Sequence, residues 1–336
     1  MPESSPTVPG RRLVLGGMSA VVLLGVAGCG VRLEEDAPDL PLIPRRSPMA
    51  GEVVLLGLLA DTLGLVRATS AGATDTERSL ADLHVRQERV LRDTLRRGGV
   101  PSGVVGTATP SASAPASLVA MEAAAAADRT RYADLGLGIG RVVVSMLAQR
   151  LAAATVLSSQ VALATPAASP SGSPSPASVT PTPSPSSTAS ESPTASSDAA
   201  AVGAILTAAR EAAHWFEVAA ARAARTDDPT RERERIEAVA TWLRRRMTVW
   251  ESTVGTAAPE APLAIPLPFP VDSVDSRRRL VAQGLEGVRA AYGRRLDALD
   301  PAGLDTAWAD LPEDLADIEV HVHEWGGALQ AFPGLS

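Results

Sequence analysis

The sequence predicts an all-α protein made of two four-helix bundles joined by a disordered linker rich in Ser, Pro and Thr. Aromatic residues make up only 3% of the chain, and Ala and Leu dominate its periodic segments, which favours helices over strands. Apolar residues recur three or four positions apart in eight segments, which is the spacing of one helix face. Residues 166–197 are almost entirely Ser, Pro, Thr and Ala, and they separate the first four segments from the last four.

The first bundle is predicted over residues 49–165, with helices at 50–69, 75–97, 117–133 and 139–163. The second of these helices shows the pattern well, because Leu80, Leu83 and Gln87 recur at helical spacing. Gly98 and Gly99 then supply a left-handed cap that ends it. On the same helix His84 and Glu88 lie four positions apart, and we expect them to form a salt-bridged pair on the surface.

The second bundle is predicted over residues 198–336. It is expected to begin only after the linker, because the linker lacks large apolar side chains that could offset the cost of ordering. Its helices are expected at 198–224, from 228 onward, at 273–298 and at 311–330. Asp228 is a good N-cap, and Pro229 and Pro312 suit the first turns of their helices. The last helix carries apolar residues at alternating spacings of four and three, as in a bundle seam: Leu311, Leu315, Ile318, Val322, Trp325 and Leu329.

The N-terminal stretch has the order of an export signal. Arg11 and Arg12 precede an apolar run over 13–27, which is too short to span a bilayer as a helix. The run ends in small residues before Cys29, and residues 26–29 resemble the bacterial lipoprotein lipobox. That resemblance implies a signal peptide over 1–28, an acylated Cys29 that anchors the chain in the cell membrane, and a proline-rich tether over 29–48. The twin arginines leave both the general and the twin-arginine export routes open.

The exported chain is acidic and has a single cysteine. Residues 1–28 carry a net charge of +1, so the formal charge after their removal is −7 − 1 = −8, which gives no electrostatic reason to bind nucleic acid. Because Cys29 is the only cysteine, the chain has no internal disulfide. Neither a phosphate-binding loop nor a Ser/His/Asp set can be defined, so the residues do not identify an enzymatic reaction.

The second half resembles the ferritin-like domain of unknown function found in actinobacterial lipoproteins. The segments that carry the resemblance are 266–271 (Pro-Leu-Pro-Phe-Pro-Val), Leu285 with Glu286, and 331–335 (Ala-Phe-Pro-Gly-Leu). The resemblance covers Asp198 to Ser336 and implies a ferritin-like four-helix bundle. It implies no particular reaction.

Ferritin-like di-metal sites use inward-facing glutamates and Glu-x-x-His pairs, so four residues are candidate ligands. They are Glu211, His214, Glu286 and His321. A helical wheel places Glu211 and His214 on the side opposite the apolar face of their helix, and His321 only flanks the seam of the last helix. We therefore expect surface positions with local pairing, and keep a di-iron or other metal site as the alternative.

Taken together, these patterns predict a membrane-anchored exported lipoprotein on the extracytoplasmic face of the cell membrane, acting as a binding or scaffolding module for an envelope partner. The alternative is a ferritin-like metal-binding protein or metal-dependent oxidoreductase. A third possibility is a small-ligand carrier, which an apolar cavity between the helices of the second half would favour.

Overall fold

The computed structural model describes residues 46–72, 74–110, 117–127, 129–132, 134–164, 194–223, 229–262, 264–299 and 301–335. The predicted signal peptide, Cys29, most of the tether and most of the linker lie outside these residues. The described residues contain helices and no strand, in agreement with the predicted all-α class. Residues Pro48–Ser336 make one compact unit.

Helices α1 to α5 come from the first half of the chain. They are α1 (Glu52–Thr69), α2 (Asp75–Arg97), α3 (Ser102–Gly106), α4 (Leu118–Ala127) and α5 (Leu137–Ala164), with a short 3-10 turn, η1, at Thr130–Tyr132. α2 has the predicted bounds because both ends are capped. The Thr74 hydroxyl accepts a hydrogen bond from Glu77 N, and the Glu77 carboxylate accepts one from Thr74 N in return. α4 ends six residues before the predicted position, and α3 forms between the helices predicted at 75–97 and 117–133, where the sequence predicts none.

Helices α6 to α9 come from the second half. They are α6 (Thr194–Ala223), α7 (Pro229–Val254), α8 (Val274–Ala298) and α9 (Pro301–Glu324), with η2 at Gly255–Ala257. α6 begins inside the predicted linker, so residues 194–197 are helical. α9 begins ten residues before the predicted start, because one internal proline, Pro312, costs a helix only part of its hydrogen bonding. It also ends early, since Gly326 adopts a left-handed φ of 87° that caps the helix.

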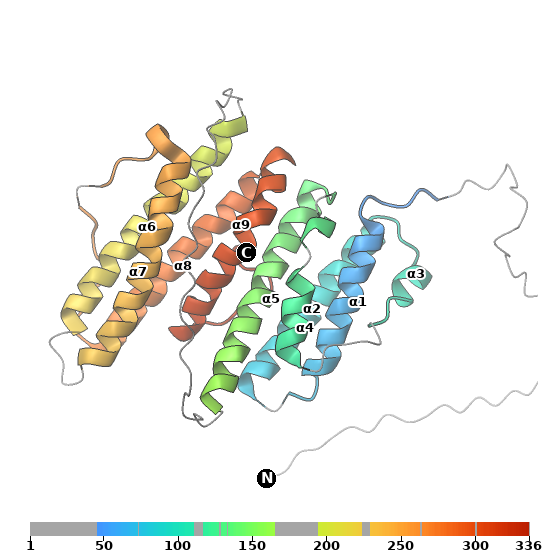
Figure 1. The fold of residues 1–336 in the computed structure, drawn as a ribbon, viewed down its shortest axis with the longest axis horizontal. Coiled ribbons are helices and arrows are strands. Elements are labelled where there is room, and N and C mark those ends of the chain that lie inside the picture. The colour runs from blue at the N-terminus through green and yellow to red at the C-terminus, as the bar shows by residue number, and fades with distance from the viewer. Residues whose placement is uncertain are drawn as a thin grey trace, which may run out of the picture. The chain divides into compact units, whose positions relative to one another are not determined.

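The helices pack as a series of neighbouring pairs (Figure 1). In the second half α6 lies against α7 and α8, and α8 contacts α9. In the first half α1 lies against α2 and α4, and α4 against α5. α9 packs along α5, so helices from the two halves share one hydrophobic core.

The chain's last described residues reinforce this junction. The Gln87 amide donates to the Ala331 carbonyl at 2.9 Å, and the Ser145 hydroxyl donates to the Pro333 carbonyl at 2.7 Å. On the other side, Gly334 touches the backbone of Gly293 in α8. The 331–335 segment is therefore held between α2 and α5 of the first half and α8 of the second.

One described helix, over Leu137–Val161 of α5, is long and apolar enough to cross a membrane by length and composition. Two thirds of its most apolar 18-residue window is buried inside the protein, and the helix carries a fully buried arginine, Arg150. A buried window of this kind is typical of a core helix, because much of its apolar surface is covered by protein.

Candidate functional site

The four predicted metal ligands lie on three helices, and two of them contact a residue of their own helix. Glu211 and His214 are partly exposed on α6. Glu286 on α8 accepts a hydrogen bond from Arg289, and Nδ1 of His321 on α9 lies 3.0 Å from a Glu324 carboxylate oxygen. Within the described ranges no three His, Cys, Asp or Glu residues are placed to share an ion. The structure thus does not bring these four residues together.

A different glutamate is buried in the second half. Glu319 of α9 is fully buried, with one carboxylate oxygen 2.7 Å from Nη1 of Arg289 and the other accepting from Gln330 N at 3.0 Å. Burial raises the pKa of the Glu319 carboxyl, and the Arg289 guanidinium opposes that shift. This carboxylate is satisfied by protein on both oxygens, which suits a structural ion pair.

A second buried group in this half centres on Asp314. It accepts a hydrogen bond from the Tyr292 hydroxyl at 2.7 Å and pairs with Arg246 of α7. Burial raises the pKa of the Asp314 carboxyl although Arg246 opposes the shift, and burial with the nearby Asp314 charge raises the pKa of Tyr292 well above its usual value. The indole of Trp250 meets the Tyr292 ring edge-on, with 5.8 Å between centroids. The group ties α7, α8 and α9 together.

The first half contains a buried polar cluster to which four helices each contribute one side chain. They are Thr62 of α1, His84 of α2, Glu122 of α4 and Arg150 of α5, and none of the four exposes any surface. Nε2 of His84 lies 2.9 Å from Oε1 of Glu122, and Nη2 of Arg150 donates to the Thr62 hydroxyl at 2.6 Å. The predicted surface pair of His84 with Glu88 is therefore wrong, and Glu88 pairs instead with Arg92.

The cluster is not fully hydrogen-bonded. Nδ1 of His84, Oε2 of Glu122, and Nε and Nη1 of Arg150 are all buried without a hydrogen-bond partner. Burial lowers the pKa of the Arg150 guanidinium, while the nearby Glu122 carboxylate is the largest influence that opposes this. The spacing of α2 could have placed His84 inside, because it falls among Leu80, Leu83 and Gln87 on the inner face of the helix. The rule that charged residues four positions apart pair on a helix surface indicated Glu88 as its partner instead.

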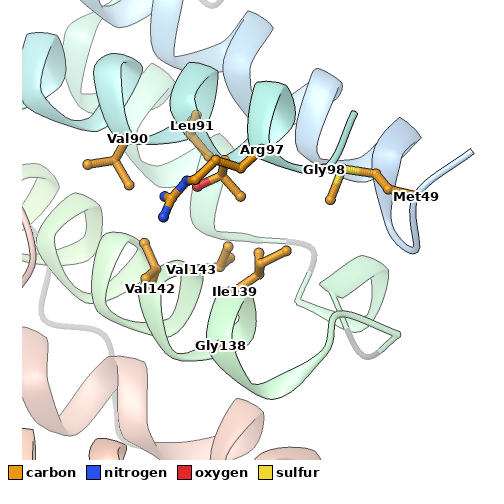
Figure 2. A pocket seen from close by; sticks show the side chains of 10 residues that line it. Met49, Val90, Leu91, Arg97, Gly98, Gly138, Ile139, Val142 and Val143 are labelled. Atoms are coloured by element: carbon orange, nitrogen blue, oxygen red, sulfur yellow. The ribbon is translucent and has the colours of Figure 1, made fainter. Parts of the chain in front are cut away.

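A pocket of about 540 Å³ opens between α2 and α5 (Figure 2). It forms here because α2 packs mainly on α1, and α5 mainly on α4 and α9, so α2 and α5 touch each other little. Leu91 and Val143 form its buried part. The remaining lining residues are Met49, Val90, Thr94, Arg97, Gly98, Gly138, Ile139 and Val142.

The charged residues that line it distinguish this pocket from two others, because acidic as well as basic side chains line each of the other two. A pocket of about 380 Å³ between α6 and α7 contains Arg233 and Arg244, which pair with Glu237 and Glu217. A pocket of about 300 Å³ near the end of α9 contains Arg235, which donates to the Glu324 carbonyl and lies over the Trp325 ring. Arg97 in the α2–α5 pocket has no acidic partner among the described residues; its Nε donates to the Asp93 carbonyl at 3.2 Å.

Comparison with protein-family models, with curated proteins and with solved structures found no match for this chain. The ferritin-like resemblance of the second half therefore still depends on its short sequence motifs. Among the described residues, the buried polar cluster of the first half is closed to solvent, whereas the α2–α5 pocket is open to it.

Proposed function

We propose that this chain is an exported lipoprotein, anchored through Cys29 on the extracytoplasmic face of the cell membrane, whose helical unit binds a ligand or partner at the envelope. Two features support the proposal. The order of residues 11–29 matches a lipoprotein export signal. The α2–α5 pocket is the structural observation that carries the binding proposal, because it combines apolar walls with a volume of about 540 Å³, which falls in the range of small-molecule sites.

For the second half we propose a ferritin-like bundle over residues 198–336. The packing of α6 against α7 and α8, and of α8 against α9, supports this proposal. The metal-dependent alternative stays a prediction. Elemental analysis of the full chain, purified without chelator, would support it if a stoichiometric metal is found and Glu211→Ala removes that metal.

The anchoring proposal is tested by labelling and fractionation in a host that processes lipoproteins. The wild-type chain should incorporate labelled palmitate and sediment with membranes. Cys29→Ser should lose both properties. As a matched control, the double variant Cys29→Ser with Ser47→Cys keeps one thiol in the tether but outside the lipobox. Labelling of that double variant, or membrane retention of unlabelled Cys29→Ser, would sink the proposal.

A further inference from the structure

We propose that the α2–α5 pocket binds a single-chain amphiphile with an anionic head, and that its carboxylate pairs with Arg97. The inference rests on the proposed binding role and names the chemical class of its ligand. It follows from three features of the pocket: its apolar walls, its volume and its one cation.

The walls can accept a hydrocarbon chain. Val90 and Leu91 line the α2 side, and Ile139, Val142 and Val143 line the α5 side, so aliphatic surfaces face each other across the opening (Figure 2). Transfer of methylene groups from water to such a surface is favourable in proportion to the area covered. A volume of about 540 Å³ lies in the lower part of the small-molecule range, which suits one acyl chain better than the two chains of a membrane phospholipid.

The cation lies at the right place for a head group. Arg97 belongs to the last turn of α2, and its side chain extends into the gap toward Val142 of α5 (Figure 2). Among the described residues no carboxylate pairs with it. Its terminal nitrogens can therefore donate two parallel hydrogen bonds to a carboxylate, the geometry that guanidinium groups favour.

Neighbouring arginines show that this arrangement is specific to Arg97. Arg96 lies beside it in the same helix turn, where any cation favours the helix dipole, yet Arg96 lies 3.8 Å from the Asp93 carboxylate. One turn earlier, Arg92 pairs with Glu88 at 2.7 Å. A role in balancing the helix dipole would thus apply equally to Arg96, whereas of these two arginines only Arg97 lacks an acidic partner among the described residues and lines the apolar pocket.

The experiment uses the Cys29→Ser chain, purified without detergent so that neither its own lipid nor detergent fills the pocket. Sodium laurate and the uncharged dodecanol are titrated calorimetrically against it. Laurate should bind once per chain, and dodecanol about tenfold or more weakly, because the alcohol lacks the charge-assisted hydrogen bonds. Arg97→Gln should lower laurate affinity to that of dodecanol, whereas the matched control Arg96→Gln should leave it unchanged.

A second variant tests the apolar walls. Val142→Phe places a ring in the opening and should abolish the binding of both amphiphiles, with circular dichroism confirming the helical fold. Equal laurate affinity in Arg97→Gln and Arg96→Gln would overturn the inference, as would full binding by folded Val142→Phe or no binding by the parent chain. Any of these results would leave membrane anchoring through Cys29 standing, since palmitate labelling tests it separately.

Discussion

At the scale of single residues, the core of the first half depends on charges that water cannot reach. Arg150 is completely buried, and the carboxylate of Glu122 provides nearby negative charge while also contacting His84. Removing one member of a buried charged group leaves the other uncompensated, which costs far more than loss of a surface pair. Substitutions in this cluster therefore test whether it holds the four helices of the first half in place.

We expect Glu122→Ala to lower the free energy of unfolding by about 3–5 kcal/mol, because Arg150 and His84 lose their buried acidic neighbour. The measurement is urea denaturation followed by circular dichroism. Asp93→Ala is the matched control: it removes the exposed partner of Arg96 and should change stability by less than about 1 kcal/mol. Equal effects of the two substitutions would show that the cluster does not stabilise the fold.

Asp314 should make stability depend on pH in a defined direction. Burial raises the pKa of its carboxyl above the usual 3.8, so the folded chain binds this proton more tightly than the unfolded chain. The wild type therefore gains stability relative to Asp314→Asn as pH falls from the raised folded pKa toward 3.8. Denaturation at about pH 7 and about pH 4 should show a larger destabilisation by Asp314→Asn at the lower pH. A smaller destabilisation in acid would contradict the shift.

Residues on regular helix faces could be predicted from the sequence, whereas their buried polar partners could not. The spacing placed Gln87 with Leu80 and Leu83 on one helix face, and it is buried there, where its amide donates to the Gln149 side chain at 2.8 Å. The pairing of His84 with Glu122 escaped prediction because the partners are on different helices, and spacing within one helix carries no information about neighbours across a core. The place of Arg97 in the α2–α5 pocket escaped for the same reason, since the pocket also needs the apolar residues of α5.

At the scale of elements, two glycines of α8 differ in the space around them: one has no room for a side chain and the other has room. Gly293 touches the backbone of Gly334, so any side chain there would push the C-terminal segment away. Gly287 lies on the exposed side of the same helix, and a methyl group added there would meet no other atom within 4 Å. The first glycine permits a close approach, while the second only costs helix stability.

We expect Gly293→Ala to destabilise the protein by about 1–3 kcal/mol, the usual cost of overpacking. Gly287→Ala, its matched control in the same helix, should stabilise by about 0.5–1 kcal/mol, because alanine favours helix more than glycine does. Chemical denaturation of both variants measures the two changes. A neutral Gly293→Ala would mean that the 331–335 segment does not pack against α8.

Helix caps explain why some element bounds followed from the sequence and others did not. α8 begins where predicted because the Ser273 hydroxyl caps the helix by accepting a hydrogen bond from Ser276 N. α9 was expected to begin near Pro312, since proline favours a first turn, but the helix extends back to Pro301. A proline can stand in the first turn of a helix or, as Pro312 does, inside one. Only the packing of the whole helix decides between these two arrangements.

At the scale of the whole molecule, the described helices of the two halves are joined directly as well as through the chain. Besides the α5–α9 packing, Arg129 pairs with Glu313 and Arg141 donates to the Leu299 carbonyl. The sequence predicted eight helices and their order well, but it contained no signal for this junction. Contacts between helices far apart in the chain depend on side chains that the helical spacing of apolar residues assigns to the exposed face.

Cutting the chain between the halves should therefore leave them associated. A protease site placed between residues 166 and 193, inside the linker predicted over 166–197, allows cleavage after folding. We expect the two fragments to elute together in gel filtration at moderate salt, because residues of both halves share one hydrophobic core, whose packing survives screening of the ion pairs. Separate elution of folded fragments would mean that the halves are independent bundles held only by the chain.

The claim that joins these scales is that a lipid-anchored helical protein acts at the membrane surface. Mass spectrometry of the intact wild-type protein, released from membranes by mild detergent, tests it most directly. The account predicts a chain that begins at Cys29 and carries the added mass of a diacylglyceryl group. A chain that retains residues 1–28, or one with an unmodified Cys29, would contradict it.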